Sequence, residues 1–460
     1  MWFRPKRLLS LLAILSTMGS APIYAQSETP DWLSVHGESR VRYQSTQNQF
    51  RVNRSGGDQL LLFRTLVDIK ADTGPITFGL ELQDSRAYLD DSGTPLTSST
   101  VNPLDILQLY SRIDALPGLL GAGSKGKLTL GRQTVSIGSK RQIERADFGN
   151  VIKSYTGAYF QSETTNGDEL HLFYVVPIGR FPSSRSELDD NALSGDEEQW
   201  GRRIWAAHYR RADLLGERVP GLWGEAFVYG LNERDKDTLQ TPNRSYIAPG
   251  ARIYRLAAPG QWDIDLEGSF RHGTRKASSA ASDQNDLDVR ASMLFASIGY
   301  TWDAPWRPHL AFEYYYASGD NDPTDDIFGQ HERLFGGRRT DLNNTSTFGP
   351  LTPANLSAPG VRFEIKPNDR WDARLYYHAA HLDSASDSWV VAKLRDPSGN
   401  SGRFIGHEID ARARYWVVPK TLRLEVGGSG LIFGRFAKTV PNGPSGNGSV
   451  FGFVQMTYSF

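Results

Sequence analysis

Residues 449–460 read Ser-Val-Phe-Gly-Phe-Val-Gln-Met-Thr-Tyr-Ser-Phe, and the chain ends on this last aromatic residue. Successive side chains of a β-strand point to opposite faces. One face of this segment is therefore apolar and consists of Val450, Gly452, Val454, Met456, Tyr458 and Phe460. The other face begins with Phe451 and Phe453 and continues with Gln455, Thr457 and Ser459. The alternation predicts a C-terminal strand with one lipid-compatible face.

The same period of two recurs along the chain. Trp262 and Leu266 lie on one parity, for example, while Asp263 and Glu267 lie on the other. Similar alternation is found in residues 309–316, 361–366 and 408–417. An amphipathic helix would instead place its apolar residues at spacings of three and four. The pattern indicates strands that meet lipid on one face and water on the other.

About eighteen such strands are predicted, with about sixteen as the lower bound. Each is close to the ~9 to 11 residues that a tilted strand needs to cross the hydrocarbon layer. Their approximate starts are residues 34, 59, 76, 105, 127, 154, 168, 200, 222, 245, 261, 289, 308, 360, 370, 406, 421 and 449. We therefore predict an all-β fold, a transmembrane antiparallel β-barrel of about 16–18 strands.

Connections of two lengths alternate between these strands. Tight links rich in turn residues include 72–75 and 257–260, whereas long polar segments include 137–153 and 318–359. Outer-membrane barrels with both termini in the periplasm have short periplasmic turns and long outer loops. We predict that orientation, with residues 318–359 as a long extracellular loop. An exported soluble propeller or solenoid is the alternative, but no repeat of about 20 to 50 residues is visible.

The N-terminus predicts export. Three basic residues within the first seven positions precede an apolar run over residues 8–18, which is typical of a secretory signal peptide. This run is too short to span a bilayer. We predict cleavage after Ala25, with Ala21 as the alternative. Residues 1–25 are then the signal peptide, and residues 26–460 form the outer-membrane barrel domain.

Composition excludes two classes of protein. The chain has 51 Lys and Arg, 52 Asp and Glu and no Cys. Interspersed charges of both signs do not indicate nucleic-acid binding, and the lack of Cys excludes a disulfide scaffold. The signal peptide and the strand pattern predict a protein of the outer membrane of a Gram-negative bacterium, in contact with lipid.

A barrel of this size encloses an aqueous channel, so its inward-facing side chains decide what passes. The predicted lining consists of basic residues at inward-facing strand positions and in the segment 132–153. They are Arg40, Arg42, Arg64, Arg112, Arg132, Arg141, Arg145, Lys153, Arg202, Arg271, Arg362, Arg374, Arg412 and Arg414. Acidic residues such as Glu267 share this surface, so wall-stabilising ion pairs are the alternative role. Basic linings favour anions, and we predict an anion path into which the segment 132–153 inserts as a loop.

Two segments resemble the alginate-export family of outer-membrane porins. The first reads Leu-Thr-Leu-Gly-Arg-Gln over residues 128–133 and continues with Gly138, Arg141, Asn150 and Tyr155. The second reads Glu-Tyr-Tyr-Tyr-Ala-Ser-Gly-Asp over residues 313–320 and is followed by Phe328, Leu334 and Phe335. The resemblance implies an eighteen-stranded monomeric barrel whose Arg-rich lumen passes an anionic polyuronate such as alginate. A channel for smaller anionic solutes is the alternative.

The chain departs from the family pattern in two places. Ser139 and Lys140 stand where the family usually has an acidic residue, and residues 336–341 read Gly-Gly-Arg-Arg-Thr-Asp in place of an aromatic-rich stretch. These departures leave the predicted barrel unchanged and bear on its substrate.

No enzyme, catalytic residue or cofactor is predicted. His378 and His381 would point to opposite faces of a strand, and the sequence has no Gly-x-Ser-x-Gly elbow. Four acidic residues at the start of the long loop are a candidate for a calcium site, with a solvated loop as the alternative. They are Asp320, Asp322, Asp325 and Asp326.

Further partners follow from the predicted location. The terminal Phe460 predicts recognition by the barrel-assembly machinery, and an exporter would meet periplasmic partners. The loop 318–359 either leaves the channel open or folds inward and plugs it. In the second case the outer loops would serve adhesion or structure.

Overall fold

The computed structural model describes residues 30–54, 56–91, 93–236, 239–342 and 347–460. The predicted signal peptide, residues 1–25, lies outside the described residues.

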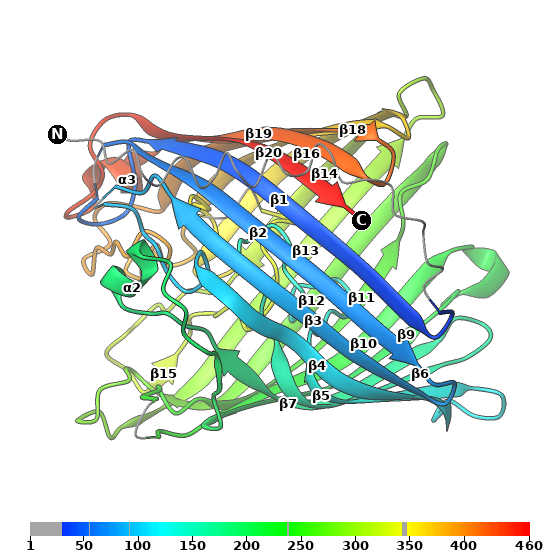
Figure 1. The fold of residues 1–460 in the computed structure, drawn as a ribbon. Coiled ribbons are helices and arrows are strands. Elements are labelled where there is room, and N and C mark those ends of the chain that lie inside the picture. Colours follow the sequence, from blue (N-terminus) through cyan, green and yellow to red (C-terminus); the bar gives the residue numbers. More distant parts are fainter. Residues whose placement is uncertain (1–29, 55, 92, 237–238, 343–346) are drawn as a thin grey trace, which may run out of the picture.

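Eighteen antiparallel strands of the described chain form a closed barrel (Figure 1). The first nine are β1 (Leu33–Gln47), β2 (Asp58–Asp72), β3 (Ile76–Tyr88), β4 (Asn102–Pro117), β5 (Lys125–Gln133), β6 (Tyr155–Glu163), β7 (Glu169–Gly179), β9 (Arg202–Arg211) and β10 (Leu222–Glu233). The other nine are β11 (Ser245–Arg255), β12 (Gln261–Lys276), β13 (Asp286–Thr301), β14 (His309–Ala317), β16 (Leu356–Asn368), β17 (Trp371–His381), β18 (Phe404–Val418), β19 (Leu422–Phe433) and β20 (Gly448–Ser459). Each pairs with the next, and β20 pairs with β1. Two short strands, β8 (Glu197–Glu198) and β15 (Ile327–Phe328), extend β7 and β13.

The observed wall confirms the predicted all-β barrel of about 18 strands. Every predicted strand start lies within four residues of an observed one. The closing strand keeps the predicted faces, because Val450 and Val454 are 59% and 58% exposed while Phe451 and Phe453 are 1% and 3% exposed. Apolar side chains thus cover the outside, and the polar parity faces the lumen.

The seam of the barrel depends on a glycine. Gly37 and Phe460 exchange two backbone hydrogen bonds of 2.9 and 3.0 Å. A Cβ atom at position 37 would lie 2.1 Å from the Phe460 ring. Glycine therefore leaves the space that the terminal aromatic ring occupies beside β1.

The two ends of the barrel differ, as the alternating connections predict. Long connections, such as that from β1 to β2, lie at one end, which we call the loop end. Short connections lie at the other, the turn end, where β1 begins and β20 stops. Figure 1 shows α2 (Arg185–Asp189), α3 (Arg435–Thr439) and β15 together at the loop end. The short helix η3 (Gly216–Arg218) belongs to a turn-end link. In the described residues no helix has the length and apolar character needed to cross a membrane.

Two loop-end segments, residues 134–154 and 318–355, fold into the lumen and join each other. The amide of Phe335 donates to the carbonyl of Gln142 at 3.1 Å, and the amide of Glu144 donates to the carbonyl of Phe335 at 3.2 Å. The amide of Gly337 donates to the carbonyl of Lys140 at 3.0 Å. This short ladder makes one inserted unit of the two segments.

Arg141 fixes the 134–154 segment to both its neighbours. Its guanidinium binds the carboxylates of Asp265 and Glu267 on β12 at 2.8 Å and that of Asp341 in the 318–355 segment at 2.9 Å. It also lies over the ring of Phe295 at 3.7 Å. Removing one member of a buried charge group leaves the others uncompensated, so Arg141 is a structural clamp.

The side chain of Asn150 anchors the same segment to the opposite side of the wall. Its amide nitrogen reaches the carbonyl oxygens of Phe63 and Arg86 at 3.2 Å and that of Thr100 at 2.8 Å. Its oxygen accepts a hydrogen bond from Arg40 at 3.3 Å. Every polar atom of this amide is used, which explains why an Asn suits the position.

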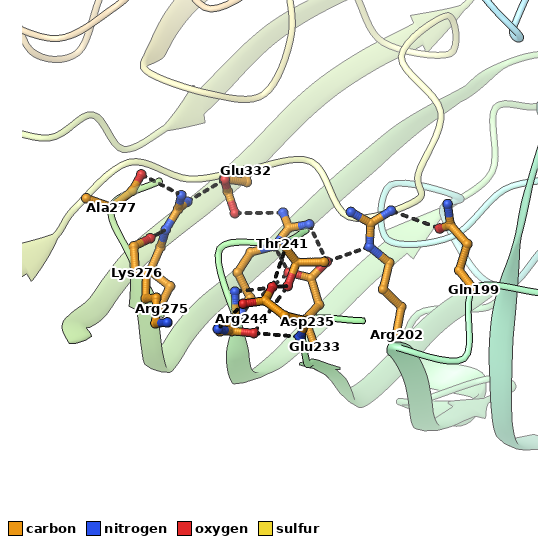
Figure 2. A network of polar contacts seen from close by, with 11 residues as sticks. Gln199, Arg202, Glu233, Asp235, Thr241, Arg244, Arg275, Lys276, Ala277 and Glu332 are labelled. Atoms are coloured by element: carbon orange, nitrogen blue, oxygen red, sulfur yellow. Dashed lines mark hydrogen bonds and ion pairs between the residues drawn. The ribbon is translucent and has the colours of Figure 1, made fainter. Parts of the chain in front are cut away.

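A second charge network, shown in Figure 2, ties the 318–355 segment to the loop end of β9 to β12. Glu332 accepts from Arg275 at 2.6 Å and from Arg244 at 3.1 Å. Glu233 on β10 in turn binds Arg244 and Arg202, each at 2.7 Å. The network holds the 318–355 segment against the wall through charges that are paired with one another.

The outward face of β20 gives a test of the membrane orientation. Replacing Val454, at the middle of the strand, with Arg should lower the free energy of unfolding by ~2 to 4 kcal/mol, because the charge enters the hydrocarbon. The same change at Val450, near the loop end, should lower the free energy of unfolding by only about 0 to 1 kcal/mol. Urea unfolding of the barrel in lipid vesicles measures both. Equal costs at the two positions would contradict the depth assigned to them.

Gly336 gives a test of the inserted unit. A Cβ atom there would lie 1.8 Å from the carbonyl oxygen of Arg141, so Gly336→Ala should force the two segments apart. We expect a larger single-channel conductance and a stability loss of about 1 to 3 kcal/mol. Gly430→Ala is the control, since its Cβ would meet nothing within 4 Å. An unchanged conductance in Gly336→Ala would show that the joined segments do not narrow the lumen.

Candidate functional site

A cavity of about 650 Å³ lies between the inserted segments and one side of the wall. The wall contributes residues of β1, β17, β18, β19 and β20, and the remaining lining comes from loop-end segments. We call it the arginine cavity because of the basic residues in its lining. They are Arg40, Arg51, Lys140, Lys153, Arg180, Arg333, Arg338, Arg339, Arg374, Arg412, Arg414 and Arg423.

Positive charge dominates this lining. The twelve basic residues face three acidic ones, Glu144, Asp147 and Glu425, so the described lining has nine more basic than acidic residues. Asp147 and Glu425 are themselves engaged, with Arg64 at 2.6 Å and with Arg339, respectively. Burial opposes the ionisation of Asp147, but Arg64 and Arg40 outweigh it and lower its pKa to about 2. Asp147 therefore pairs with a residue outside the lining, whereas Glu425 offsets the charge of one lining residue, Arg339.

Four loop-borne cations gather at the loop end of the cavity, namely Lys153, Arg180, Arg333 and Arg338. In the described part of the chain none of them forms an ion pair with a carboxylate. Burial, reinforced by repulsion from the three arginines, holds the pKa of Lys153 well below its usual range. Burial and repulsion from Arg333 and Arg51 likewise lower the pKa of Arg338. Like charges held together without counter-charges form a site that an anion stabilises.

The turn-end half of the cavity is lined from the wall. Arg412 and Arg414 share the carboxylate of Asp372 at 3.1 and 3.0 Å. Arg374 lies over the ring of Tyr376, with its guanidinium carbon 5.0 Å from the ring centroid. Arg423 lies over Trp416 in the same way, at 5.3 Å. Stacking on a ring fixes a guanidinium while leaving its donors available.

Phe148 holds two arginines where the inserted segments meet the wall. Its ring lies between two guanidinium groups, Arg42 on β1 at 4.2 Å and Arg339 of the 318–355 segment at 3.7 Å. Arg42 also donates to the carbonyl of Phe148 at 2.5 Å. The ring thus connects the wall, the 134–154 segment and the 318–355 segment at one point.

A second cavity of about 380 Å³ adjoins the first at the loop end. The two share Lys153, Arg180 and Phe335, so these three side chains stand between them. We call the second cavity the antechamber. Its lining includes no acidic residue, and its third cation, Arg202, is already paired with Glu233.

The structure separates the fourteen basic residues predicted to line the pore into three groups. Five of them, Arg40, Lys153, Arg374, Arg412 and Arg414, line the arginine cavity. Seven others do not line this cavity and are bound to carboxylates: Arg64, Arg112, Arg132, Arg141, Arg145, Arg202 and Arg362. For these seven, the alternative role as wall-stabilising ion pairs applies.

The last two predicted residues are buried without a described carboxylate partner. Arg42 is held by Phe148, and Arg271 lies over the ring of Tyr246 at 4.5 Å. Neither lines the arginine cavity or the antechamber. Arg132 also departs from the predicted lining, since it lies opposite Leu109, which is exposed on the outer face, and binds Asp196 at 3.3 Å.

The predicted lining lacks seven cations of the cavity. Lys140 lies in the segment 132–153 that is predicted to insert, and Arg423 has the inward parity of β19. The other five lie in loops. They are Arg51, Arg180, Arg333, Arg338 and Arg339. Strand parity cannot place loop residues. A signal was nevertheless present, because Arg338 and Arg339 belong to the stretch 336–341 in which the chain departs from the family pattern.

The calcium hypothesis for the acidic loop is not supported. The Asp322 carboxylate accepts from the Thr324 hydroxyl at 2.6 Å, and Asp325 accepts from the amide of Ile327 at 2.8 Å. Within the described ranges, no three His, Asp or Glu side chains are grouped as a metal site requires. The aspartates instead stabilise the local turns of this loop.

Comparison with solved structures shows the same fold. The crystal structure of OccK5 (OpdH) of Pseudomonas aeruginosa has 10% sequence identity and a TM-score of 0.57, covering 93% of this chain and 98% of that one. OccK2 (OpdF) of the same organism in complex with glucuronate has 12% identity and a TM-score of 0.55, covering 93% and 96%. The outer-membrane protein OprD of Pseudomonas aeruginosa has 12% identity and a TM-score of 0.55, covering 93% of both chains.

Comparison at the level of sequence gives the family. No curated protein matches this chain. The family model described as "Alginate export" matches residues 31–447, nearly the whole described barrel. The protein is accordingly a channel of the Gram-negative outer membrane and not an enzyme. The chain belongs to the alginate-export family of outer-membrane porins.

Proposed function

We propose that this porin passes anionic solutes and that its cargo is carbohydrate bearing carboxylate groups, in the form of uronate units. The observation that carries the proposal is the lining of the arginine cavity, with twelve basic and three acidic residues. Most of these bases are arginines, whose planar donor groups suit carboxylates and stay charged at any relevant pH.

Two further facts support uronate as the cargo. The family is described by alginate, which is a polyuronate, and the solved structure of the similar barrel OccK2 holds glucuronate. Within this chain, the stacked Arg374 and Arg423 on the wall offer a second set of donors besides the loop-borne cations. A carboxylate released by one set can be taken up by the other without crossing an acidic surface.

The joined inserted segments set the size of the cargo. Between them and the wall they leave a cavity of about 650 Å³, within the ~300 to 1,000 Å³ range of small-molecule sites. We propose single uronates and short oligomers as the solutes that pass this closed arrangement. The loop end would face the outside of the cell and the chain ends the periplasm, in the orientation of short-turned barrels.

Ion selectivity in planar bilayers tests the charge of the path. With a KCl gradient, the reversal potential of the wild-type channel should show preference for chloride. Replacing Arg333 and Arg338 together with Gln should move the chloride-to-potassium permeability ratio towards unity, because the double change removes two cations without a described carboxylate partner. Arg290→Gln is the control, since Arg290 is exposed in a pair with Asp288. A cation-selective wild-type channel would contradict the proposal.

Solute uptake tests the cargo. Proteoliposomes should swell faster in glucuronate than in a neutral hexose of the same size, by a factor on the order of ten if the cavity concentrates anions. Equal rates would remove uronates as the preferred cargo. Block of chloride current by long oligouronates, together with their transport, would instead favour the polymer as cargo.

A further inference from the structure

We infer that the antechamber is a separate binding site for a single sugar acid, occupied before the solute enters the arginine cavity. The inference rests on the proposed function and adds to it a recognition step for hydroxyl groups. Its residues are Lys153, Tyr155, Arg180, Phe181, Gln199 and Phe335.

Two basic groups of the antechamber have no carboxylate partner in the described chain. No acid is among the described lining residues, and Lys153 and Arg180 form no ion pair with described carboxylates. Burial lowers the pKa of Arg180, and Asp196 and Tyr155 only partly offset that effect. Arg180 donates one hydrogen bond, to the hydroxyl of Ser99 at 2.9 Å, and keeps other donors for a ligand. A carboxylate placed between Lys153 and Arg180 would supply the missing counter-charge.

A buried hydroxyl gives the second, independent observation. Tyr155 is 1% exposed, and its hydroxyl has no hydrogen-bond partner among the described residues. A buried polar group without a partner costs ~1 to 3 kcal/mol. Because Tyr155 lies beside the antechamber, a solute that enters this cavity could supply the missing hydrogen bond. A simple inorganic anion needs no such group. A solute with hydroxyl groups beside its carboxylate would satisfy it.

Phe335 lies between the two cavities and packs against the side chain of Tyr155. Its ring packs edge-on against Tyr155, with centroids 5.7 Å apart, and Lys153 lies over its face at 5.6 Å. Phe335 also carries two of the backbone hydrogen bonds that join the inserted segments. A sugar ring that packs against Phe335 would displace it from Tyr155, which opens the hydroxyl to the solute and opens the way into the arginine cavity.

The remaining lining fits a carbohydrate acid. Phe181 and Phe335 provide apolar ring surface for the C–H faces of a sugar, and serine, glutamine and basic side chains surround them. The side-chain oxygen of Gln199 is used by Arg202 at 2.9 Å, while its amide nitrogen is a donor in the lining. The site therefore offers charge for a carboxylate and hydrogen bonds for hydroxyl groups.

Two ring carboxylates that differ in their hydroxyl groups separate this site from plain charge attraction. Glucuronate and cyclohexanecarboxylate should each reduce the single-channel chloride current of the full-length porin in planar bilayers. In the wild type, glucuronate should act at the lower concentration. Tyr155→Phe should raise its half-blocking concentration roughly 2- to 10-fold, the effect of one neutral hydrogen bond, and leave that of cyclohexanecarboxylate unchanged. Lys153→Met should raise both, on the order of 10-fold or more.

Tyr246→Phe is the matched control. Tyr246 is also a buried tyrosine whose hydroxyl has no described partner, but it lies outside the antechamber. This change should leave the block by both probes unaltered, and circular dichroism confirms that each variant is folded. Equal shifts in Tyr155→Phe and Tyr246→Phe, or none in Tyr155→Phe and Lys153→Met, would overturn the antechamber site. A wild-type channel without anion preference would instead refute the proposed function, whatever the variants do.

Discussion

Lipid on the outside of a closed sheet leaves the lumen as the place for almost every charge of the wall. The closing strand shows the constraint in its simplest form, since Val454 faces out and Gln455, the next residue, is buried inside. Eighteen strands make a barrel too wide for side chains alone to fill. The interior must therefore be filled by water or by loops, and here the 134–154 and 318–355 segments enter it. Their contacts with the wall decide how much of the lumen remains open and which charges border the remaining space.

Cations that are bound to carboxylates and cations that are not have different roles in the lumen. Arg141, bound by three carboxylates, and Arg64, bound by Glu38 and Asp147, fix the inserted segments and leave no charge for a solute. Lys153 and Arg338 lack such partners in the described chain and border the cavity. The same residue type thus serves as an anchor where carboxylates bind it away from the cavity, as in Arg141. It serves as lining where it borders the cavity, with an acid beside it, as in Arg412, or without one, as in Arg338. The arginine cavity lies at one side of the lumen. On the other side of the inserted unit, the acids of β10 to β14 are paired in clamps and networks.

The sequence predicted the wall well because a two-residue period survives in each strand independently of the rest of the chain. It predicted the site only in part. Parity shows that Arg362 and Arg374 both face inward, but it cannot show that Glu313 neutralises the first while a tyrosine ring supports the second. Arg132 was misplaced because it belongs to the irregular strand β5, where the face it shares with Leu130 is the outer one. Arg333 and Arg338 reach the cavity only through contacts between segments almost 200 residues apart in sequence, which no local pattern records.

The division between anchors and lining also explains why family resemblance and substrate need not coincide. Arg141 and Asn150, two residues that carry the resemblance, hold the 134–154 segment in place through buried polar contacts. Residues 338 and 339, in the stretch that departs from the family pattern, contribute their guanidinium groups to the cavity. Changing the anchor Arg141 would cost the inserted unit its position, whereas changing Arg338, which has no described carboxylate partner, would chiefly alter the charge of the cavity. The anchors therefore account for the barrel shared with the family, and the solute preference proposed for this chain depends on the residues that line its cavity.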